Sequence, residues 1–372
     1  MEYLVESWSL FAILGSAFVI GWAAETAQTF IPKALALSLL AWLQTLPEFA
    51  VEATIAWNQQ RDLMIANLTG SLRLLVGLGW PMIFFVFFFC QKARTGKWEK
   101  EILLDDADSY SVLFLFLSVL YFCVILFKGE LNCWDSVVLT AIYVAYLVLI
   151  ARLPVEAHED EDDLPWIGKK IVKLPHVQKV TAVTALFLGG GVVLYLSAHP
   201  FVETLQKWSV TFGISTFVFV QWVAPFLSEF PEKVSAFNWA RQKGKAPMAV
   251  MNMVSSNINQ WTMLAAMIPL VFSLSLGRFE GVHFDHMHWV ELALTIAQSA
   301  LAGLFLLDLR FTLAECTAIF VLWLAQFIDA HLREEIAIIY VVWFVLAVLH
   351  YTIRYLRTGY VPRSIAYIKG HK

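Results

Sequence analysis

Two short stretches decide the fold of this chain of 372 residues, LQTLPE at residues 43–48 and LSEFPE at residues 227–232. Each ends in Pro-Glu, and each leads to a stretch that contains asparagine and serine, NLTGS at 67–71 and NMVSSN at 252–257. The offset in residue number between Pro47 and Pro231 is nearly the same as that between Asn67 and Asn252. Because the offset stays nearly constant across the connecting sequence, we expect an internal repeat that covers most of the chain.

The composition is that of a membrane protein. Apolar residues make up 59% of the chain and charged residues only 15%, against roughly a quarter charged in a soluble domain. About eleven apolar runs approach the length of about 20 residues that a helix needs to cross a bilayer. We therefore predict an all-α polytopic membrane protein. Its helices are expected near residues 8–24, 34–57, 62–90, 109–127, 132–151, 180–198, 208–240, 247–276, 288–307, 311–328 and 335–356.

Charge and cysteine content exclude several other classes. A net charge of −4 without basic clusters argues against nucleic-acid partners, so the expected partners are the lipid bilayer and inorganic cations, and nothing indicates an oligomeric state. The four cysteines show no CxxC spacing, which predicts neither disulfides nor a zinc site. The chain also lacks HExxH, GxSxG and a phosphate loop, so an intramembrane enzyme is disfavoured and no cofactor is expected.

The basic residues predict the topology. Most of them fall into segments 92–100, 152–179, 241–245 and 354–372, which would all lie on one side of the membrane. The positive-inside rule makes that side cytoplasmic. We therefore expect an external N-terminus and a cytoplasmic C-terminus in a plasma (inner) membrane.

The repeat and the topology together give the expected organisation. Residues 8–151 form a first repeat of five helices and residues 180–330 a second one, joined by a cytoplasmic acidic linker at 152–179. Residues 331–372 add a C-terminal helix and a cytoplasmic tail. Because the loop after the first Pro-Glu helix is external and the loop after the second is cytoplasmic, the repeats are inverted, as in alternating-access transporters.

Two glutamates mark the expected site. Glu48 and Glu232 stand mid-helix in apolar surroundings, where a carboxylate costs on the order of 2.5–3.5 kcal/mol, so each is a functional candidate. The preceding prolines free backbone carbonyls one turn earlier. Together with nearby hydroxyl, amide and carboxylate groups these oxygens form a set suited to Ca²⁺ or Na⁺. Two carboxylates balance one Ca²⁺, two Na⁺ or two protons, which is a physical basis for exchange.

Both repeats, near residues 10–80 and 190–270, resemble the alpha-repeats of the cation/Ca²⁺ exchanger superfamily. Its Na⁺/Ca²⁺ exchangers carry a pattern close to G-T-S-x-P-E followed by G-N-x-x-G-S-N-x-x-N/D. The resemblance implies ten core helices, with cation sites where helices 2, 3, 7 and 8 meet, and here an eleventh helix. It implies Glu48 and Glu232 as the central cation ligands, supported by Gln44, Thr45, Ser228, Glu229, Ser71, Ser256 and Gln260.

The departures from that pattern concern the counter-ion. Leu75 replaces one oxygen ligand, and Glu229 replaces a serine that helps to bind Na⁺. Glu229 and Lys233 are spaced to pair at i, i+4; alternatively, Lys233 acts as a built-in cation or Glu229 as a proton site. Glu52, one turn after Glu48, is a candidate for proton transfer or charge tuning.

We therefore expect a secondary antiporter that exchanges Ca²⁺ for Na⁺ or H⁺ by alternating access. The alternative is a non-transporting homologue that serves as a membrane cation sensor or scaffold.

Three further charged features have structural interpretations. The acidic residues at 156–163 are expected to be a solvated linker, with binding of regulatory Ca²⁺ as the alternative. The HFDHMH stretch at 283–288 is expected to be a solvated loop, with metal binding as the alternative. Arg73 is expected to face outward or to have a charged partner.

Overall fold

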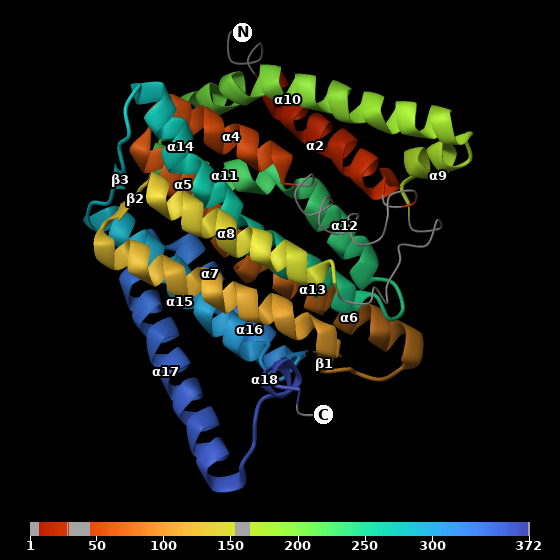
Figure 1. Cartoon of the computed structure of the whole chain (residues 1–372), viewed down its shortest axis with the longest axis vertical. Coiled ribbons are helices and arrows are strands. Elements are labelled where there is room, and N and C mark those ends of the chain that lie inside the picture. Colours follow the sequence, from red (N-terminus) through yellow and green to blue (C-terminus); the bar gives the residue numbers. More distant parts are fainter. Residues whose placement is uncertain (1–6, 28, 30–44, 153–163, 371–372) are drawn as a thin grey trace. The chain divides into compact units, whose positions relative to one another are not determined.

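The computed structural model describes residues 7–27, 29, 45–152 and 164–370 and is almost entirely helical, as the composition predicts (Figure 1). The helical segments are α2 (Trp8–Ala27), α4 (Leu46–Trp57), α5 (Arg61–Leu74), η1 (Leu75–Gly79), α6 (Trp80–Thr95), η2 (Asp106–Asp108), α7 (Ser109–Lys128), α8 (Cys133–Ile150), α9 (Trp166–Val172), α10 (His176–Phe212), α11 (Thr216–Ser228), α12 (Phe230–Ala240), α13 (Ala246–Asn259), η4 (Gln260–Leu264), α14 (Ala265–Leu276), α15 (His286–Phe305), α16 (Leu313–Ile328), η5 (Ala330–Leu332), α17 (Arg333–Thr358) and α18 (Arg363–Ile368). The strands are β1 (Glu101–Leu103), β2 (Glu130–Leu131), β3 (Val282–His283) and β4 (Arg310–Thr312).

The helices have the length and composition of membrane spans. Among the described residues, seven continuous helical stretches are long and apolar enough to cross a bilayer, and α11 and α16 are shorter apolar helices. The added helix, α17, exposes a row of large apolar side chains that includes Ile338, Val345 and Leu349. Such a surface is stable against lipid and unstable against water, so the chain is an integral membrane protein.

Two predicted helices have different bounds in the structure. The helix expected at 180–198 is much longer, because α10 continues through Pro200 and ends only before Gly213, whose φ of 68° is left-handed. The helix expected at 208–240 is three segments: the end of α10, α11 and α12. Proline is tolerated inside membrane helices because neighbouring groups satisfy the freed backbone, whereas a left-handed glycine ends a helix.

The chain forms two compact units, and each contains parts of both repeats. Unit 1 consists of residues 1–68, 147–234 and 271–278. Unit 2 consists of residues 69–146, 235–270 and 279–372. The predicted repeats are therefore not separate structural bodies, because each contributes its first helices to unit 1 and its later helices to unit 2.

In unit 1, α2 lies along α10, and both contact α4 and α11 (Figure 1). Close approach of α2 and α10 needs the glycine at 190, because a Cβ there would lie 2.9 Å from Ile20. Ala23 and Val183 continue this contact in a small buried cluster with α9. The helix that carries Glu48 is thus held on several sides by packed helices.

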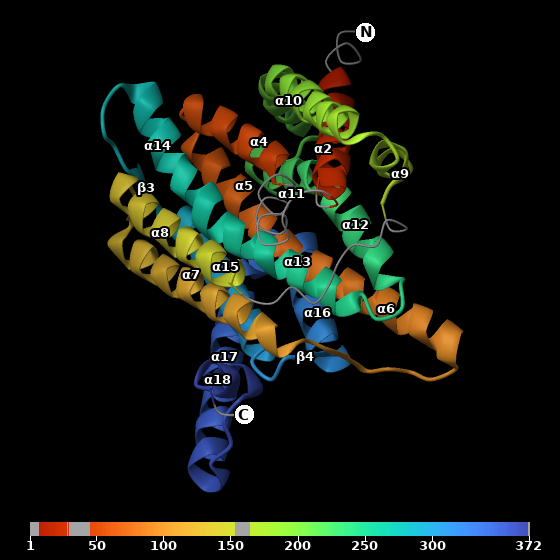
Figure 2. The same cartoon turned by 45° about the vertical axis from the view of Figure 1, so that its right-hand side comes forward.

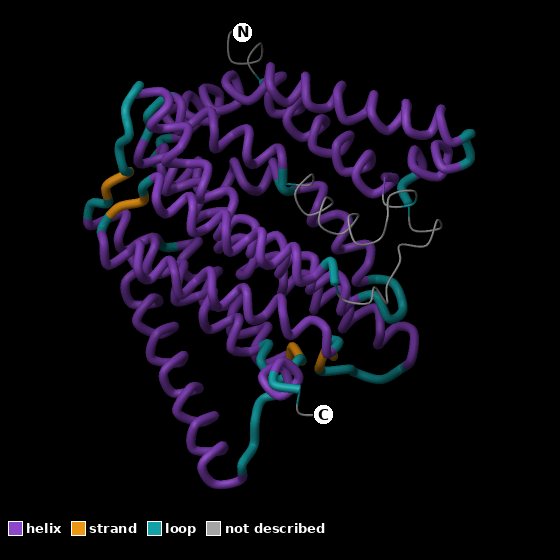
Figure 3. Tube along the Cα trace, viewed as in Figure 1, coloured by secondary structure: helices purple, strands orange, loops and turns teal. Residues whose placement is uncertain are grey.

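Unit 2 shows that the repeats are inverted. β1 pairs antiparallel with β4, and β2 pairs antiparallel with β3 (Figure 3). Helix α7 leads from β1 to β2, and α15, its counterpart in the second repeat, leads from β3 to β4. These two helices pack against each other and run in opposite directions between the two strand pairs (Figure 2). Equivalent helices that point in opposite directions are the defining feature of an inverted repeat.

A second sign of the symmetry lies where α5 meets α13 in unit 2. The Asn257 amide donates a hydrogen bond of 3.5 Å to the Leu72 carbonyl. These two residues are related by the same offset in residue number as Asn67 and Asn252. Equivalent positions meet only close to a symmetry axis, so the pseudo-twofold axis passes through this contact.

Candidate cation site

In unit 1, Glu48 lies in the first turn of α4, which begins at Leu46 with Pro47 as its second residue. Its side chain is buried, and so is Thr45, which occupies the N-cap position. Gln44 lies outside the described residues. The prediction of a mid-helix glutamate is therefore wrong: because Pro47 has no N–H to donate and is favoured at a helix start, α4 begins at this point.

The second repeat has the same arrangement. Helix α11 ends at Ser228, and α12 begins at Phe230, the position equivalent to Leu46. Pro231 is again second and Glu232 third, so Glu232 also lies in a first turn rather than mid-helix, and its side chain is buried. The Ser228 hydroxyl donates to the Ala224 carbonyl at 3.0 Å, which leaves the lone pairs of its oxygen as ligand candidates.

The position in a first turn changes the electrostatics of both glutamates. The N-terminus of a helix carries a partial positive charge, and a carboxylate there is stabilised by about 0.3–1 kcal/mol, more in partly buried geometries. Discontinuous membrane helices whose ends form ion sites are typical of transporters with inverted repeats. Glu48 and Glu232 thus occupy positions where a buried carboxylate can bear a negative charge.

Glu229 and Lys233 form an ion pair beside Glu232. The Lys233 ammonium lies 2.5 Å from a Glu229 carboxylate oxygen, and both side chains are buried. This is the i, i+4 pairing that the spacing predicts, and it compensates the additional carboxylate of the second repeat. Alternatives in which either residue acts as an independent charge agree less well with this geometry, because a buried pair costs several kcal/mol to separate.

Glu52 and Asn67 form a different pair in the first repeat. Both are buried, and the Asn67 amide donates a hydrogen bond of 2.6 Å to one carboxylate oxygen of Glu52. The other Glu52 oxygen and the Asn67 oxygen have no hydrogen-bond partner among the described residues. Glu52 follows Glu48 by one helical turn, on the same face of α4.

Unit 2 holds the other predicted ligands. Ser71 on α5 and Ser256 on α13 are fully buried, each one residue from the Leu72–Asn257 contact that marks the symmetry axis. Gln260, also fully buried, is the first residue of η4. Leu75, where the family pattern predicts an oxygen ligand, is the first residue of η1.

These last two positions begin matched π-helical segments. η1 and η4 have the same length and start at equivalent positions of the two repeats. A π-helical turn displaces backbone hydrogen bonds, and such turns are frequent at functional sites. Side chains donate hydrogen bonds to backbone carbonyls at equivalent positions of the two repeats. The Gln298 amide donates to the Arg73 carbonyl at 3.2 Å, and the Thr262 hydroxyl donates to the Ile258 carbonyl at 2.5 Å. The prolines and glycines of these helices predict bends, but they do not predict the π-helical segments.

Unit 2 also contains a buried network of charged residues that the sequence did not predict. The Arg73 guanidinium forms an ion pair with Glu291 of α15, and Glu291 forms a second one with Arg333 of α17. Arg73 also donates to Gln326 at 2.8 Å. Arg73 therefore has a charged partner and does not face outward. Glu291 stands alone in an apolar run, and that signal could have identified it.

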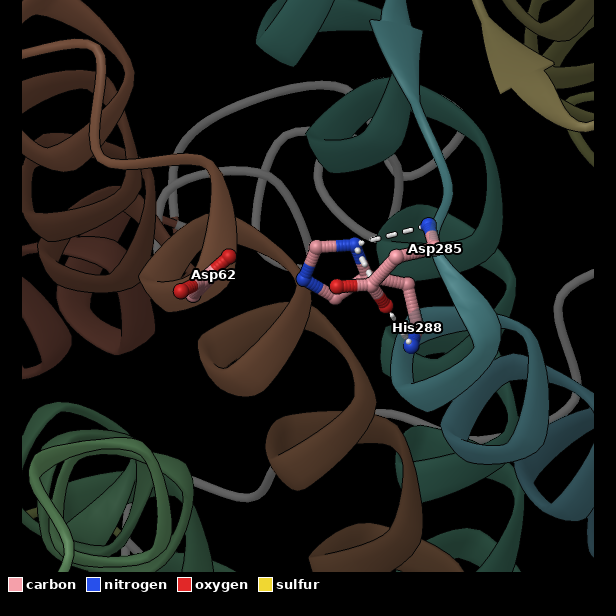
Figure 4. Close-up of side chains that lie close together, drawn as sticks. All are labelled: Asp62, Asp285 and His288. Carbon is pink, nitrogen blue, oxygen red and sulfur yellow. Dashed lines mark hydrogen bonds and ion pairs between the residues drawn. The ribbon is translucent and has the colours of Figure 1, made fainter.

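The HFDHMH stretch is solvated only in part: His283, Asp285, His286 and Met287 are exposed, but its last three residues begin α15. Asp285 caps α15 by accepting a hydrogen bond of 2.8 Å from the His288 backbone N–H, and the His288 ring is buried (Figure 4). Asp62, drawn in the same figure, belongs to unit 1. The acidic residues at 156–163 lie outside the described residues.

The structure thus brings the predicted residues into two groups, one in each unit. Unit 1 holds Thr45, Glu48, Glu52, Ser228, Glu229, Glu232 and Lys233, and unit 2 holds Ser71, Ser256 and Gln260. All of them are buried. Chemically, the group in unit 1 is rich in hard oxygen atoms and includes two carboxylates at equivalent helix starts.

Comparison with known proteins identifies the family of the chain. The family model of the sodium/calcium exchanger protein matches residues 4–152 and 182–328. A crystal structure of the H⁺/Ca²⁺ exchanger CAX is 30% identical, with 99% of this chain and 92% of that chain covered and a TM-score of 0.88. No curated protein sequence matches the chain.

Two more distant structures share the fold. The sodium-calcium exchanger NCX_Mj is 19% identical over 88% of this chain and 97% of its own, with a TM-score of 0.56. Native YfkE is 16% identical over 87% of this chain and 91% of its own, with a TM-score of 0.61. The chain therefore belongs to the sodium/calcium exchanger family, within the cation/Ca²⁺ exchanger superfamily. Members of this family are membrane antiporters of Ca²⁺ and other cations, not enzymes.

Proposed function

We propose that this protein exchanges Ca²⁺ for H⁺ by alternating access, with Glu48 and Glu232 as the central cation ligands. The observation that carries the proposal is the equivalence of the two glutamates. Each is the buried third residue of a helix whose second residue is proline, in matched positions of two inverted repeats. Packing alone does not require two carboxylates in this arrangement.

Charge balance explains how these residues couple two ion flows. One Ca²⁺ neutralises both carboxylates, and so do two protons, whereas the empty site carries two buried negative charges. Moving an uncompensated charge through an apolar interior costs several kcal/mol. The site therefore changes its access between the two sides when it is loaded and not when it is empty.

Two features support H⁺ as the counter-ion. Glu229, at the position of a Na⁺-binding serine, is held by Lys233, and Leu75 supplies no oxygen at another ligand position. Both differences remove Na⁺ ligands, while a proton needs only a carboxylate. The structure matched at 30% identity is that of an H⁺/Ca²⁺ exchanger.

We also propose the topology and the repeat boundaries. The strand pairs β1–β4 and β2–β3 join segments that the distribution of basic residues assigns to the same side, cytoplasmic and external respectively. This agreement supports an external N-terminus and a cytoplasmic C-terminus in the plasma (inner) membrane. The repeats are residues 8–151 and 180–330, separated by the linker at 152–179 and followed by the C-terminal part at 331–372.

The test is uptake of ⁴⁵Ca²⁺ into proteoliposomes that contain the purified full chain. We expect uptake when the lumen is more acidic than the medium, so that protons leave as Ca²⁺ enters. An imposed Na⁺ gradient at constant pH should drive at most a small fraction of that flux. Uptake that follows the Na⁺ gradient would reassign the counter-ion. If neither the pH gradient nor the Na⁺ gradient drives uptake, the antiporter proposal is wrong.

A further inference from the structure

Glu52 is a buried carboxylate with one described partner. In the part of the chain that the structure describes, its hydrogen bond of 2.6 Å to Asn67 is the only interaction of either side chain. Each residue keeps one buried oxygen atom without a hydrogen-bond partner among the described residues. Buried polar atoms are nearly always satisfied, so a pair of open acceptors needs an explanation. Two acceptor atoms and no donor are suited to a mobile proton.

The surroundings of Glu52 contain no compensating cation in the described residues. Helices α2, α10 and α11 pack against α4. Their ionisable side chains are Glu25 on α2 and His176, Lys179, Tyr195, His199, Glu203 and Lys207 on α10, and α11 has none. On α4 and α5 the charged residues are Glu48, Arg61, Asp62 and Arg73. No charged side chain among the described residues interacts with Glu52. Glu52 can therefore hold a proton but cannot remain ionised at low cost.

The position of Glu52 connects the candidate ligand to the end of the helix. Four residues separate it from Glu48, a rise of about 6 Å. Six residues further on, α4 ends at the exposed loop of Asn58 and Gln59. Asn67 lies at the matching depth on α5, six residues after its first residue, Arg61. The pair thus lies between Glu48 and the α4–α5 loop.

The second repeat lacks this pair. The position equivalent to Glu52 is Ala236, at the offset that relates Glu48 to Glu232. Ala236 is fully buried and has no group that holds a proton. A function of Glu52 therefore acts on the side of the first repeat only.

We propose that Glu52 and Asn67 form a proton relay between Glu48 and the α4–α5 loop, an inference that rests on the proposed H⁺/Ca²⁺ exchange. When Ca²⁺ binds, the O–H bond of protonated Glu48 breaks, and its electron pair stays on the carboxylate that now faces Ca²⁺. Glu52, protonated at rest, first releases its proton to water at the loop, and the electron pair of that O–H bond stays on its carboxylate. The proton from Glu48 then passes through a bridging water and forms a new O–H bond at the open oxygen of Glu52, which returns to its protonated state. Asn67 holds the carboxylate in place by donating to its other oxygen.

The relay is tested by comparing two fluxes of the reconstituted full chain. Uptake of ⁴⁵Ca²⁺ driven by a pH gradient needs proton transfer, whereas exchange of ⁴⁵Ca²⁺ for unlabelled Ca²⁺ at equal pH needs none. We expect Glu52→Gln to slow the pH-driven flux by about tenfold or more and to leave Ca²⁺/Ca²⁺ exchange within about twofold. Glu203→Gln, at an exposed glutamate of α10, should change neither flux.

Two further variants separate the relay from an effect on folding. Glu52→Asp keeps the carboxyl group and should recover part of the pH-driven flux, and Asn67→Leu should slow the same flux selectively. Equal loss of both fluxes in all three variants, or no loss in any, would overturn the relay. If the wild-type protein shows Ca²⁺/Ca²⁺ exchange but no pH-driven uptake, H⁺ coupling itself is wrong, which is a different result.

Discussion

The first turns of α4 and α12 have the same backbone plan and different charges around it. Both helices have proline second and glutamate third, and they start at equivalent positions of the two repeats. Around Glu48 the additional group is Glu52, bonded only to a neutral amide among the described residues. Around Glu232 it is Glu229, compensated by Lys233.

This difference separates the roles of the residues. The two repeats share the helix starts and their glutamates, and a site that serves both sides of the membrane needs these features in both repeats. Residues that occur in only one repeat act on one side of the membrane or tune one ligand. The Glu229–Lys233 pair leaves the charge of the site at two carboxylates, and Glu52 adds a proton acceptor on the first-repeat side.

The largest effect is expected from removing either shared carboxylate. Glu48→Gln and Glu232→Gln keep the size of the side chain but remove the charge that binds Ca²⁺, so each alone should reduce ⁴⁵Ca²⁺ uptake to the level of protein-free liposomes. Loss of even an outer-shell partner costs about 10–100-fold in metal affinity. If one variant retains most of the flux while the other has none, the two glutamates are not equivalent. Glu203→Gln again serves as the control.

The second effect concerns the unshared ion pair. Lys233→Met leaves the Glu229 carboxylate buried without its partner and should lower the free energy of unfolding by about 3–5 kcal/mol. The double variant Glu229→Gln/Lys233→Met removes both charges and should recover most of that loss. Thermal unfolding in detergent measures both. A double variant as unstable as the single one would show that the pair is not what compensates Glu229.

The smallest effect compares the π-helical segments. Thr262→Val removes the hydroxyl that donates to the Ile258 carbonyl, and Gln298→Leu removes the amide that donates to Arg73. Each leaves a buried carbonyl less satisfied, so each should cost about 1–2 kcal/mol of unfolding free energy. Thr181→Val removes the same kind of bond at an exposed site and should cost less than about 0.5 kcal/mol. A cost for Thr262→Val no greater than that of the control would contradict the role of these bonds.

The repeat, the paired glutamates and the family were predictable from the sequence, because constant residue spacing and charged residues within apolar runs can be recognised without a structure. The Glu229–Lys233 pair was predictable for the same reason, since i, i+4 spacing places both on one face of a helix. These features depend on local geometry.

Features that depend on tertiary contacts were missed. The helix starts at Leu46 and Phe230 place the glutamates in first turns. Proline also lies inside α10 without ending it, so proline alone does not predict a helix boundary. Arg73, Glu291 and Arg333 lie on three different helices and meet only in the folded unit. The π-helical segments depend on side chains such as Gln298 that reach across from another helix.

The most direct test of two shared carboxylates as the coupling site is the ratio of ions exchanged. Proteoliposomes with a Ca²⁺ indicator and a pH indicator, held at zero membrane potential, report both movements in one experiment. We expect close to two protons to leave for each Ca²⁺ that enters, because either load neutralises Glu48 and Glu232. Entry of Ca²⁺ without counterflow of protons would contradict the proposed mechanism.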